Sequence, residues 1–141
     1  MCGIAGIFNL NKQPVALKQV EHMADAIAHR GPDGEGFFVK DQVGLAHRRL
    51  AILDVSAMGA QPMTSKNDEW VVVFNGCIYN FLELKQELQA RGHSFVSKTD
   101  TEVIVEGLVA YGPDFFQRLN GMFAVAAWNK QEEALYFSRD R

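Results

Sequence analysis

Residues 1–8, MCGIAGIF, place a cysteine directly after the initiator methionine and follow it with a short apolar run. The stretch CGIAGIF, residues 2–8, is short, apolar and contains glycine, and it predicts a buried β-strand. Cys2 then has two interpretations. It is a small hydrophobic residue at the start of that strand, or, once Met1 is removed, it is the first residue of the mature chain and carries a thiol and a free amine on one carbon. The other motifs of the sequence decide between these two interpretations.

The composition is that of a single globular domain. The chain has 141 residues, of which 48% are hydrophobic and 22% charged, enough for a hydrophobic core. The net charge of −3 and the scattered Lys and Arg give no argument for a nucleic-acid or membrane partner. The apolar start is too short for a signal peptide or a membrane span. We therefore expect a cytoplasmic protein with reduced thiols.

The cysteines and histidines share no pattern that predicts a metal site. Cys2 and Cys77 lie far apart and form neither a disulfide framework nor a zinc motif. The four histidines are well separated and have no ligand spacing with either cysteine.

Hydrophobic periodicity predicts an α+β domain. Helices are expected over residues 15–30, from Asn80 to Gly92, and over 102–112 after Thr99; Asn80 with Glu83 and Thr99 with Glu102 resemble capping boxes. Strands are expected over residues 2–8, 36–40, 43–50, 50–55, 70–76, 122–128 and 134–138. The chain stops on a strand and its exit, so we expect a C-terminally truncated domain.

Eight motifs, each weak alone, follow one another in a characteristic order. They are MCGIAGIF (1–8), HRGPDGEG (29–36), LAHRRLAILDVS (45–56), QPM (61–63), VFNGCIYN (73–80), SKTDTEVI (97–104), LNGMFAVAAWN (119–129) and SRDR (138–141). In this order the chain resembles, over essentially its whole length, the glutamine amidotransferase domain of the asparagine synthetase family. This domain is of class II, the N-terminal-nucleophile type.

The resemblance implies a fold and an activity. The fold would be the four-layer αββα sandwich of N-terminal-nucleophile hydrolases, over residues 2–141 and incomplete at its C-terminus. The activity would be hydrolysis of glutamine to glutamate and ammonia, with the ammonia used for ATP-dependent synthesis of asparagine from aspartate. The implied partners are glutamine and a C-terminal synthetase domain that is absent here, and a homodimer stays open. ATP and Mg²⁺ are expected for that absent domain, and no cofactor for this one.

The resemblance selects the second interpretation of Cys2, and elementary chemistry supports it. Hydrolysis of an amide is acyl transfer, which needs a nucleophile, a base and an oxyanion site. A free α-amine has a pKa of about 7.7–8.0, so near neutral pH it is partly unprotonated and can accept the thiol proton. Cys2 without Met1 would supply both groups.

The remaining roles are carried over by motif. Asn75 and Gly76 match the oxyanion hole, although an Asn-Gly pair that merely ends a strand is the alternative. Arg49 matches the group that binds the α-carboxylate of glutamine, since a guanidinium donates two parallel hydrogen bonds to a carboxylate. Asp100 matches the carboxylate that faces the α-ammonium, and a helix N-cap is its alternative. The backbone of Leu50, Ala51, Ile52 and Leu53 is expected to complete the pocket wall.

One position departs from the family pattern. Cys77 stands where a glutamate ordinarily helps to hold the substrate ammonium, so weaker glutamine binding is expected. Either Asp100 carries the ammonium alone, or the substrate differs, or the domain is degenerate; a disulfide between Cys2 and Cys77 is a further hypothesis. The alternative functions are an amidotransferase for another acceptor, such as a cell-envelope sugar precursor, and a non-catalytic regulatory or assembly module.

Overall fold

The structure is a computed structural model that describes residues 2–52 and 55–141. Its first half contains β1 (Gly3–Phe8), α1 (Leu17–Ala26), η1 (Ala28–Arg30), β2 (Gly34–Lys40), β3 (Val43–Arg49), η2 (Ala57–Gly59) and β4 (Met63–Thr64). Its second half contains β5 (Trp70–Ile78), α2 (Phe81–Ala90), α3 (Asp100–Tyr111), η3 (Gly112–Arg118), β6 (Gly121–Asn129) and β7 (Ala134–Arg139).

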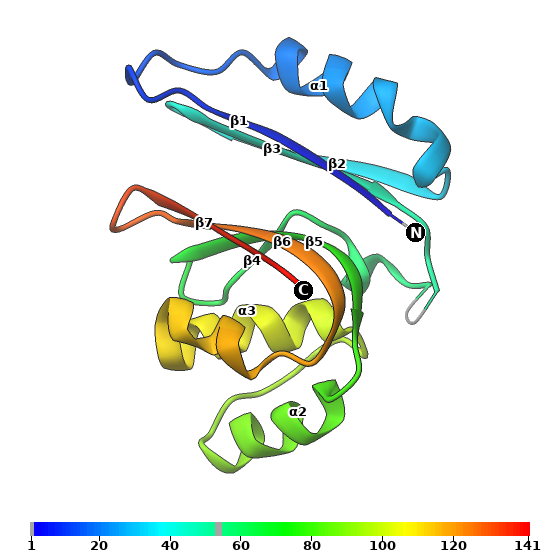
Figure 1. Ribbon diagram of the computed structural model, residues 1–141, viewed down its shortest axis with the longest axis vertical. Coiled ribbons are helices and arrows are strands. Elements are labelled where there is room, and N and C mark those ends of the chain that lie inside the picture. The colour runs from blue at the N-terminus through cyan, green and yellow to red at the C-terminus, as the bar shows by residue number, and fades with distance from the viewer. Residues whose placement is uncertain (1, 53–54) are drawn as a thin grey trace.

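These elements form four layers. Two antiparallel sheets, with strand orders β1-β3-β2 and β4-β5-β6-β7, face each other. Helix α1 covers the outer face of the first sheet, and α3 and α2 lie beneath the second (Figure 1). The predicted αββα sandwich is confirmed.

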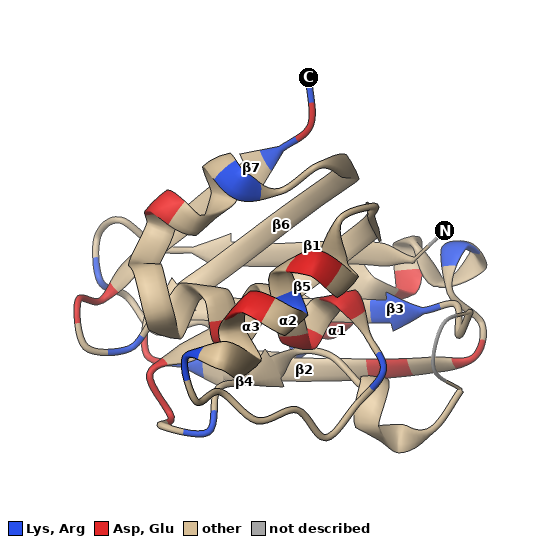
Figure 2. Ribbon diagram, turned by 90° about the horizontal axis from the view of Figure 1, so that it is seen from below, with Lys and Arg blue, Asp and Glu red and all other residues tan. Residues whose placement is uncertain are grey.

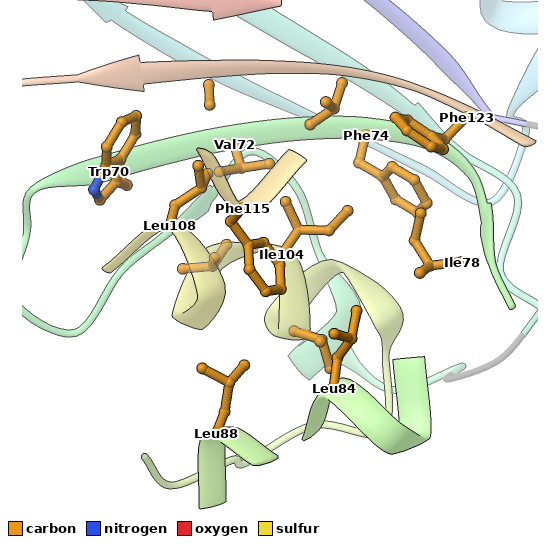
Figure 3. Close-up of a cluster of buried hydrophobic side chains, with 14 residues drawn as sticks. Trp70, Val72, Phe74, Ile78, Leu84, Leu88, Ile104, Leu108, Phe115 and Phe123 are labelled. Atoms are coloured by element: carbon orange, nitrogen blue, oxygen red, sulfur yellow. The ribbon is translucent and has the colours of Figure 1, made fainter. Parts of the chain in front are cut away.

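The alternation of side chains along β5 separates two of the hydrophobic cores. Trp70, Val72 and Phe74 point towards α3 and α2, where they pack in one cluster with side chains of both helices (Figure 3). Val71 and Val73 point the other way and pack between the two sheets. Because successive residues of a strand face opposite sides, a continuous apolar run such as WVVVF fits a strand buried on both faces.

The space between the sheets is apolar at its centre and polar at one end. On β3, Val43 and Leu45 face this space, and the same alternation turns His47 and Arg49 towards it. On β5, Asn75 lies on the same side of the strand as the buried residues Val71 and Val73. The polar residues of both strands therefore meet at one end of a hydrophobic layer.

The two predicted capping boxes have different outcomes. Thr99 caps α3, and its hydroxyl oxygen accepts a hydrogen bond from the N–H of Glu102 at 3.2 Å. The prediction at Asn80 is wrong, because this side chain makes no cap bond to α2. It donates instead to the carbonyl of Arg118 and accepts from the N–H of Asn120, which ties the start of α2 to the end of η3.

The predicted strand over residues 50–55 is also wrong in its described part. Residues 50–52 and Val55 lie outside any strand. The reason is that this backbone bonds to side chains rather than to a strand: the N–H of Leu50 donates to Cys2 Sγ, and the N–H of Ala51 donates to Asp33.

Charged residues of both signs are spread along the ribbon, with a basic segment on β3 (Figure 2). The three α-helices have 10, 10 and 12 residues. Among the described residues, no helix is long and apolar enough to cross a membrane.

Candidate active site

A cavity of about 100 Å³ opens at the polar end of the space between the sheets. Its walls include most of the residues predicted from sequence, namely Cys2, Arg49, Leu50, Ala51, Ile52, Asn75, Gly76 and Asp100. Leu53 lies outside the described residues. Cys77 follows Gly76 in sequence but does not line the cavity. Segments from four distant parts of the chain thus meet at one site.

Both the thiol and the backbone carbonyl of Cys2 form hydrogen bonds. Its Sγ accepts a hydrogen bond from the N–H of Leu50 at 3.3 Å and donates to the carbonyl of Leu50 at 3.6 Å. Arg30 Nε donates to the carbonyl oxygen of Cys2 at 3.1 Å. Both Cys2 and Cys77 carry free thiols in the structure.

The open edge of β5 supplies the second functional element. Among the described residues, β4 pairs with Val71 and Val72 alone, and no other described strand lies along the rest of this edge. In an antiparallel ladder the N–H groups of alternate residues point to the same edge. The N–H of Phe74 donates to Gln61 Oε1 at 2.6 Å, and the N–H of Ile78 donates to Asp100 Oδ2 at 3.0 Å.

Gly76 lies between these two residues in the same alternation, so its N–H points to the same edge. Gly76 also lines the cavity. The side chains of Gln61 and Asp100 bind the N–H groups of Phe74 and Ile78, and the N–H of Gly76 between them is left for a ligand. The arrangement therefore offers a backbone donor to an oxygen bound in the cavity.

The backbone at Gly76 excludes every other residue type. Its φ of +154° lies in a region that residues with a Cβ rarely adopt. A Cβ at this position would come within 2.2 Å of the carbonyl oxygen of Met122 and 2.6 Å of Phe123 Cα. The close approach of β6 thus requires glycine.

Two unsatisfied polar atoms mark the cavity as a ligand site. Among the described residues, His47 Nε2 and Asn75 Oδ1 are the buried side-chain nitrogen and oxygen atoms without a hydrogen-bond partner. Both residues line the cavity. A buried polar atom left unpaired costs about 1–3 kcal/mol, and a polar ligand in the cavity would remove this cost.

Arg49 and Asp100 place opposite charges in the cavity wall. Arg49 Nη1 donates to the carbonyl of Ser56 at 2.8 Å, and its own carbonyl accepts from the N–H of Asp33 at 2.9 Å. Asp100 is 4% exposed, and burial raises the pKa of its carboxyl, although the N–H of Ile78 opposes this. Since Thr99 is the N-cap of α3, Asp100 does not fill that role.

Cys77 lies beside Asp100 rather than in the cavity wall. Burial, and secondarily the charge of Asp100, raises the pKa of the Cys77 thiol. The Asp100 carboxylate accepts a hydrogen bond from the N–H of Ile78, the residue after Cys77, which places this carboxylate near position 77. Among the described residues, no group of three or more His, Cys, Asp or Glu side chains could hold a metal ion.

His47, Gln61 and Thr101 also line the cavity, and the sequence did not predict them as site residues. His47 shares the alternation of Arg49, and this was a usable signal. Gln61 Nε2 donates to the hydroxyl of Thr101 at 3.1 Å, and no local pattern predicts a contact between residues so far apart.

Stability should fall in mild acid because of His47. Burial, which dominates, and the charge of Arg49 lower the pKa of His47 to about 4, against the opposing effect of a hydrogen bond to the backbone of Phe74. In the unfolded chain the His47 ring takes up a proton near pH 6.5, whereas in the folded protein it stays neutral down to about pH 4. The stability of the fold is therefore complete above pH 6.5, and part of it is lost as pH falls towards 4. The loss is about 3 kcal/mol.

Urea unfolding of the wild type and His47→Gln at pH 7.0, 5.5 and 4.5 measures this loss. We expect the difference between the two proteins to shrink as pH falls. Asp100, whose raised pKa has the opposite effect on stability, is present in both proteins, so its effect cancels in the comparison. Parallel pH profiles would show that His47 does not cause the loss.

The four layers, with Cys2 directly before β1 and in the cavity wall, match the αββα sandwich expected from sequence. A solved glutamine phosphoribosylpyrophosphate amidotransferase from B. subtilis superposes with a TM-score of 0.79 at 21% identity, over 97% of this chain and 37% of that one. This likeness supports the fold.

Sequence comparison identifies the family. A family model described as a glutamine amidotransferase domain matches residues 1–141, and the chain therefore belongs to that family. It is 41% identical to asparagine synthetase [glutamine-hydrolyzing] 1 of Bacillus subtilis, over 99% of this chain and 22% of the relative. It is 38% identical to asparagine synthetase B [glutamine-hydrolyzing] of Escherichia coli, over 99% of this chain and 25% of the relative. The chain thus spans about a quarter of these relatives or less.

Proposed function

We propose that this domain hydrolyses the side-chain amide of glutamine through Cys2 and supplies the ammonia for asparagine synthesis from aspartate. The observation that carries the proposal is the meeting of a thiol, a backbone donor at Gly76 and two opposite charges in one cavity. Cys2 is the nucleophile, and removal of Met1 exposes the amine that serves as its base. A chain that retains Met1 would have an amide in place of this base and would be inactive.

The reaction is balanced by water alone. Cys2 Sγ attacks the carboxamide carbon while the α-amine of Cys2 takes the thiol proton. That proton passes to the leaving nitrogen, ammonia departs, and a thioester to Cys2 remains. Water then attacks the thioester, which releases glutamate and restores the thiol.

Asn75 and Gly76 stabilise the negative oxygen of both tetrahedral intermediates. The Gly76 N–H lies on the open edge of β5, and the Asn75 side chain faces the cavity from the same strand. Loss of one such donor typically costs about 2.7–4 kcal/mol of transition-state stabilisation. The side chains of Arg49 and Asp100 bind the α-carboxylate and the α-ammonium of glutamine.

The ammonia is used outside this domain. In the proposal, a synthetase domain that uses ATP and Mg²⁺ activates aspartate and receives the ammonia. The printed names of the B. subtilis and E. coli relatives, which join asparagine synthesis to glutamine hydrolysis, support this assignment.

The role of Arg49 provides a direct test. With glutamine as substrate and glutamate formation as the readout, Arg49→Lys should raise KM by about 10- to 100-fold, because lysine cannot form the bidentate pair. Arg48→Lys is the matched control: Arg48 pairs with Asp25 and Glu35 rather than lining the cavity. An unchanged KM in Arg49→Lys would refute the assignment.

Restoring a carboxylate at position 77 should tighten glutamine binding. Cys77→Glu would add a charged hydrogen-bond acceptor beside Asp100, worth about 1.5–3 kcal/mol towards an ammonium. We therefore expect KM to fall by about 10- to 100-fold with little change in kcat. Cys77→Gln, which has the same shape without the charge, should not show this fall, and an equal effect of both variants would exclude an ammonium contact.

A further inference from the structure

Gln61 lies at a junction between elements of the fold, in the wall of the cavity. It belongs to the QPM motif of residues 61–63, lies between η2 and β4, and is 8% exposed. Its Oε1 accepts a hydrogen bond from the N–H of Phe74 on β5 at 2.6 Å, and its Nε2 donates to the hydroxyl of Thr101 on α3 at 3.1 Å. One buried amide thus joins the edge of β5 to the first turn of α3.

The main chain of Gln61 lies against the first sheet as well. A Cβ at Gly36 on β2 would come within 2.0 Å of the Gln61 carbonyl oxygen. Any residue with a side chain at position 36 would therefore push this segment away from β2. Because its main chain packs on one sheet and its amide bonds to a strand of the other, the position of Gln61 is fixed from both sides.

This junction stands beside groups that the proposed reaction uses. Phe74 precedes Gly76 on the same edge of β5, and Thr101 follows Asp100 at the start of α3. The Asp100 carboxylate in turn accepts a hydrogen bond from the N–H of Ile78, further along that edge, at 3.0 Å. The edge of β5 is therefore tied to the amino end of α3 on either side of Gly76.

We propose that Gln61 is a positioning residue, whose amide sets the spacing between the Gly76 N–H, which binds the oxyanion, and the Asp100 carboxylate, which binds the ammonium of the same glutamine molecule. The inference rests on the proposed function for these two roles. Gln61 acts through Phe74 and Thr101 rather than on the reacting atoms. A change in the spacing still permits glutamine to bind, but it weakens the transition state, which requires both contacts at once.

Gln61→Met tests this role, because methionine has a similar size but neither the amide oxygen nor the amide nitrogen. Glutamate formation is measured in the full-length protein that carries this domain. We expect kcat to fall by about 10- to 100-fold, while KM rises by no more than about threefold.

Ser65→Ala is the matched control for this variant. Ser65 is also buried, and its hydroxyl accepts from another N–H of β5, that of Trp70, at 2.9 Å, but Ser65 lies outside the cavity wall. Ser65→Ala should therefore lose stability in urea unfolding, as Gln61→Met does, and keep the wild-type kcat. A fall in kcat as large as that of Gln61→Met would show that any lost bond on this edge has the same effect, and would overturn the proposal.

A second pair of variants tests the Thr101 end of the bridge. Thr101→Val keeps the shape and removes the hydroxyl, so it should lower kcat by about tenfold. Thr101→Ser keeps the hydroxyl and should stay within about threefold of wild type. Because Gln61 and Thr101 act through one contact, the double variant with Gln61→Met and Thr101→Val should be no slower than Gln61→Met alone.

Three further results would overturn the proposal. They are a wild-type kcat in Gln61→Met or in Thr101→Val, a defect confined to KM, and losses in the double variant that multiply as if the two residues acted independently.

Hydrogen exchange of the Ile78 amide separates the role of Gln61 from the proposed function. Gln61 bonds to the edge of β5 at Phe74, whereas Ile78 bonds to Asp100. If Gln61 sets the spacing between β5 and α3, its loss also weakens the bond at Ile78, and this amide should exchange at least about tenfold faster in Gln61→Met. In Ser65→Ala it should exchange at the wild-type rate. Faster exchange in Gln61→Met, in a protein whose wild type has no glutaminase activity, would refute the proposed function and keep the spacing role, and unchanged exchange would refute the spacing role.

Discussion

Replacement of Cys2 by alanine is expected to abolish release of ammonia from glutamine, with a fall in kcat of at least about 10⁴-fold. The cavity wall contains the thiol of Cys2, which forms hydrogen bonds with the N–H and the carbonyl of Leu50. The described residues provide no second thiol in this wall. Glutamine binding should survive, because Arg49 and Asp100 are untouched. Glutamate formation and glutamine affinity, measured on the same preparation, check both expectations.

Cys77→Ala is the matched control for this prediction. It removes the other free thiol, which lies beside Asp100 rather than in the cavity wall. Its kcat should stay within about threefold of wild type. Glutaminase activity that persists in Cys2→Ala would refute the proposed mechanism, as would activity in protein whose intact mass still includes Met1.

Gly76→Ala has the second-largest expected effect, and it acts on the fold as well as on turnover. The added Cβ would come within 2.2 Å of the Met122 carbonyl oxygen in a backbone of φ +154°. The backbone strain alone typically costs about 1–3 kcal/mol, and the clash forces β5 and β6 apart where the Gly76 N–H must be aimed. We expect a loss of at least about 3 kcal/mol in the free energy of unfolding and of at least about 100-fold in kcat.

Gly92→Ala isolates the clash. Gly92 also has a positive φ, +94°, but a Cβ there would meet nothing within 4 Å. It should lose about 1 kcal/mol of stability from backbone strain and retain full kcat. Equal destabilisation of the two variants, measured by urea unfolding, would show that the contact with β6 is unimportant.

The fold could be predicted because local and global signals agree. The run WVVVF is apolar at every position, and the structure buries both of its faces, one against α3 and one against the first sheet. Alternation along β3 and β5 also carries His47, Arg49 and Asn75 to the same end of one layer. The order of the motifs then identified the residues around the cavity.

The structural predictions that were wrong share a different cause. The backbone of residues 50–52 forms no strand because Cys2 and Asp33, both distant in sequence, take its hydrogen bonds. Asn80 lacks a capping role because residues near Arg118 offer its side chain better-placed partners. Contacts of this kind depend on how the layers stack, which periodicity does not encode.

The central claim is that Cys2, freed of Met1, is the nucleophile for a glutamine side chain. A glutamine analogue that carries an electrophilic carbon in place of the amide tests this claim most directly. After treatment of the protein, peptide mass spectrometry should find an N-terminal peptide that begins with Cys2 and carries one adduct on its sulfur, and excess glutamine should slow the labelling. An N-terminal peptide that still begins with Met1 in active protein, or a Cys2 thiol that stays unlabelled, would contradict the account.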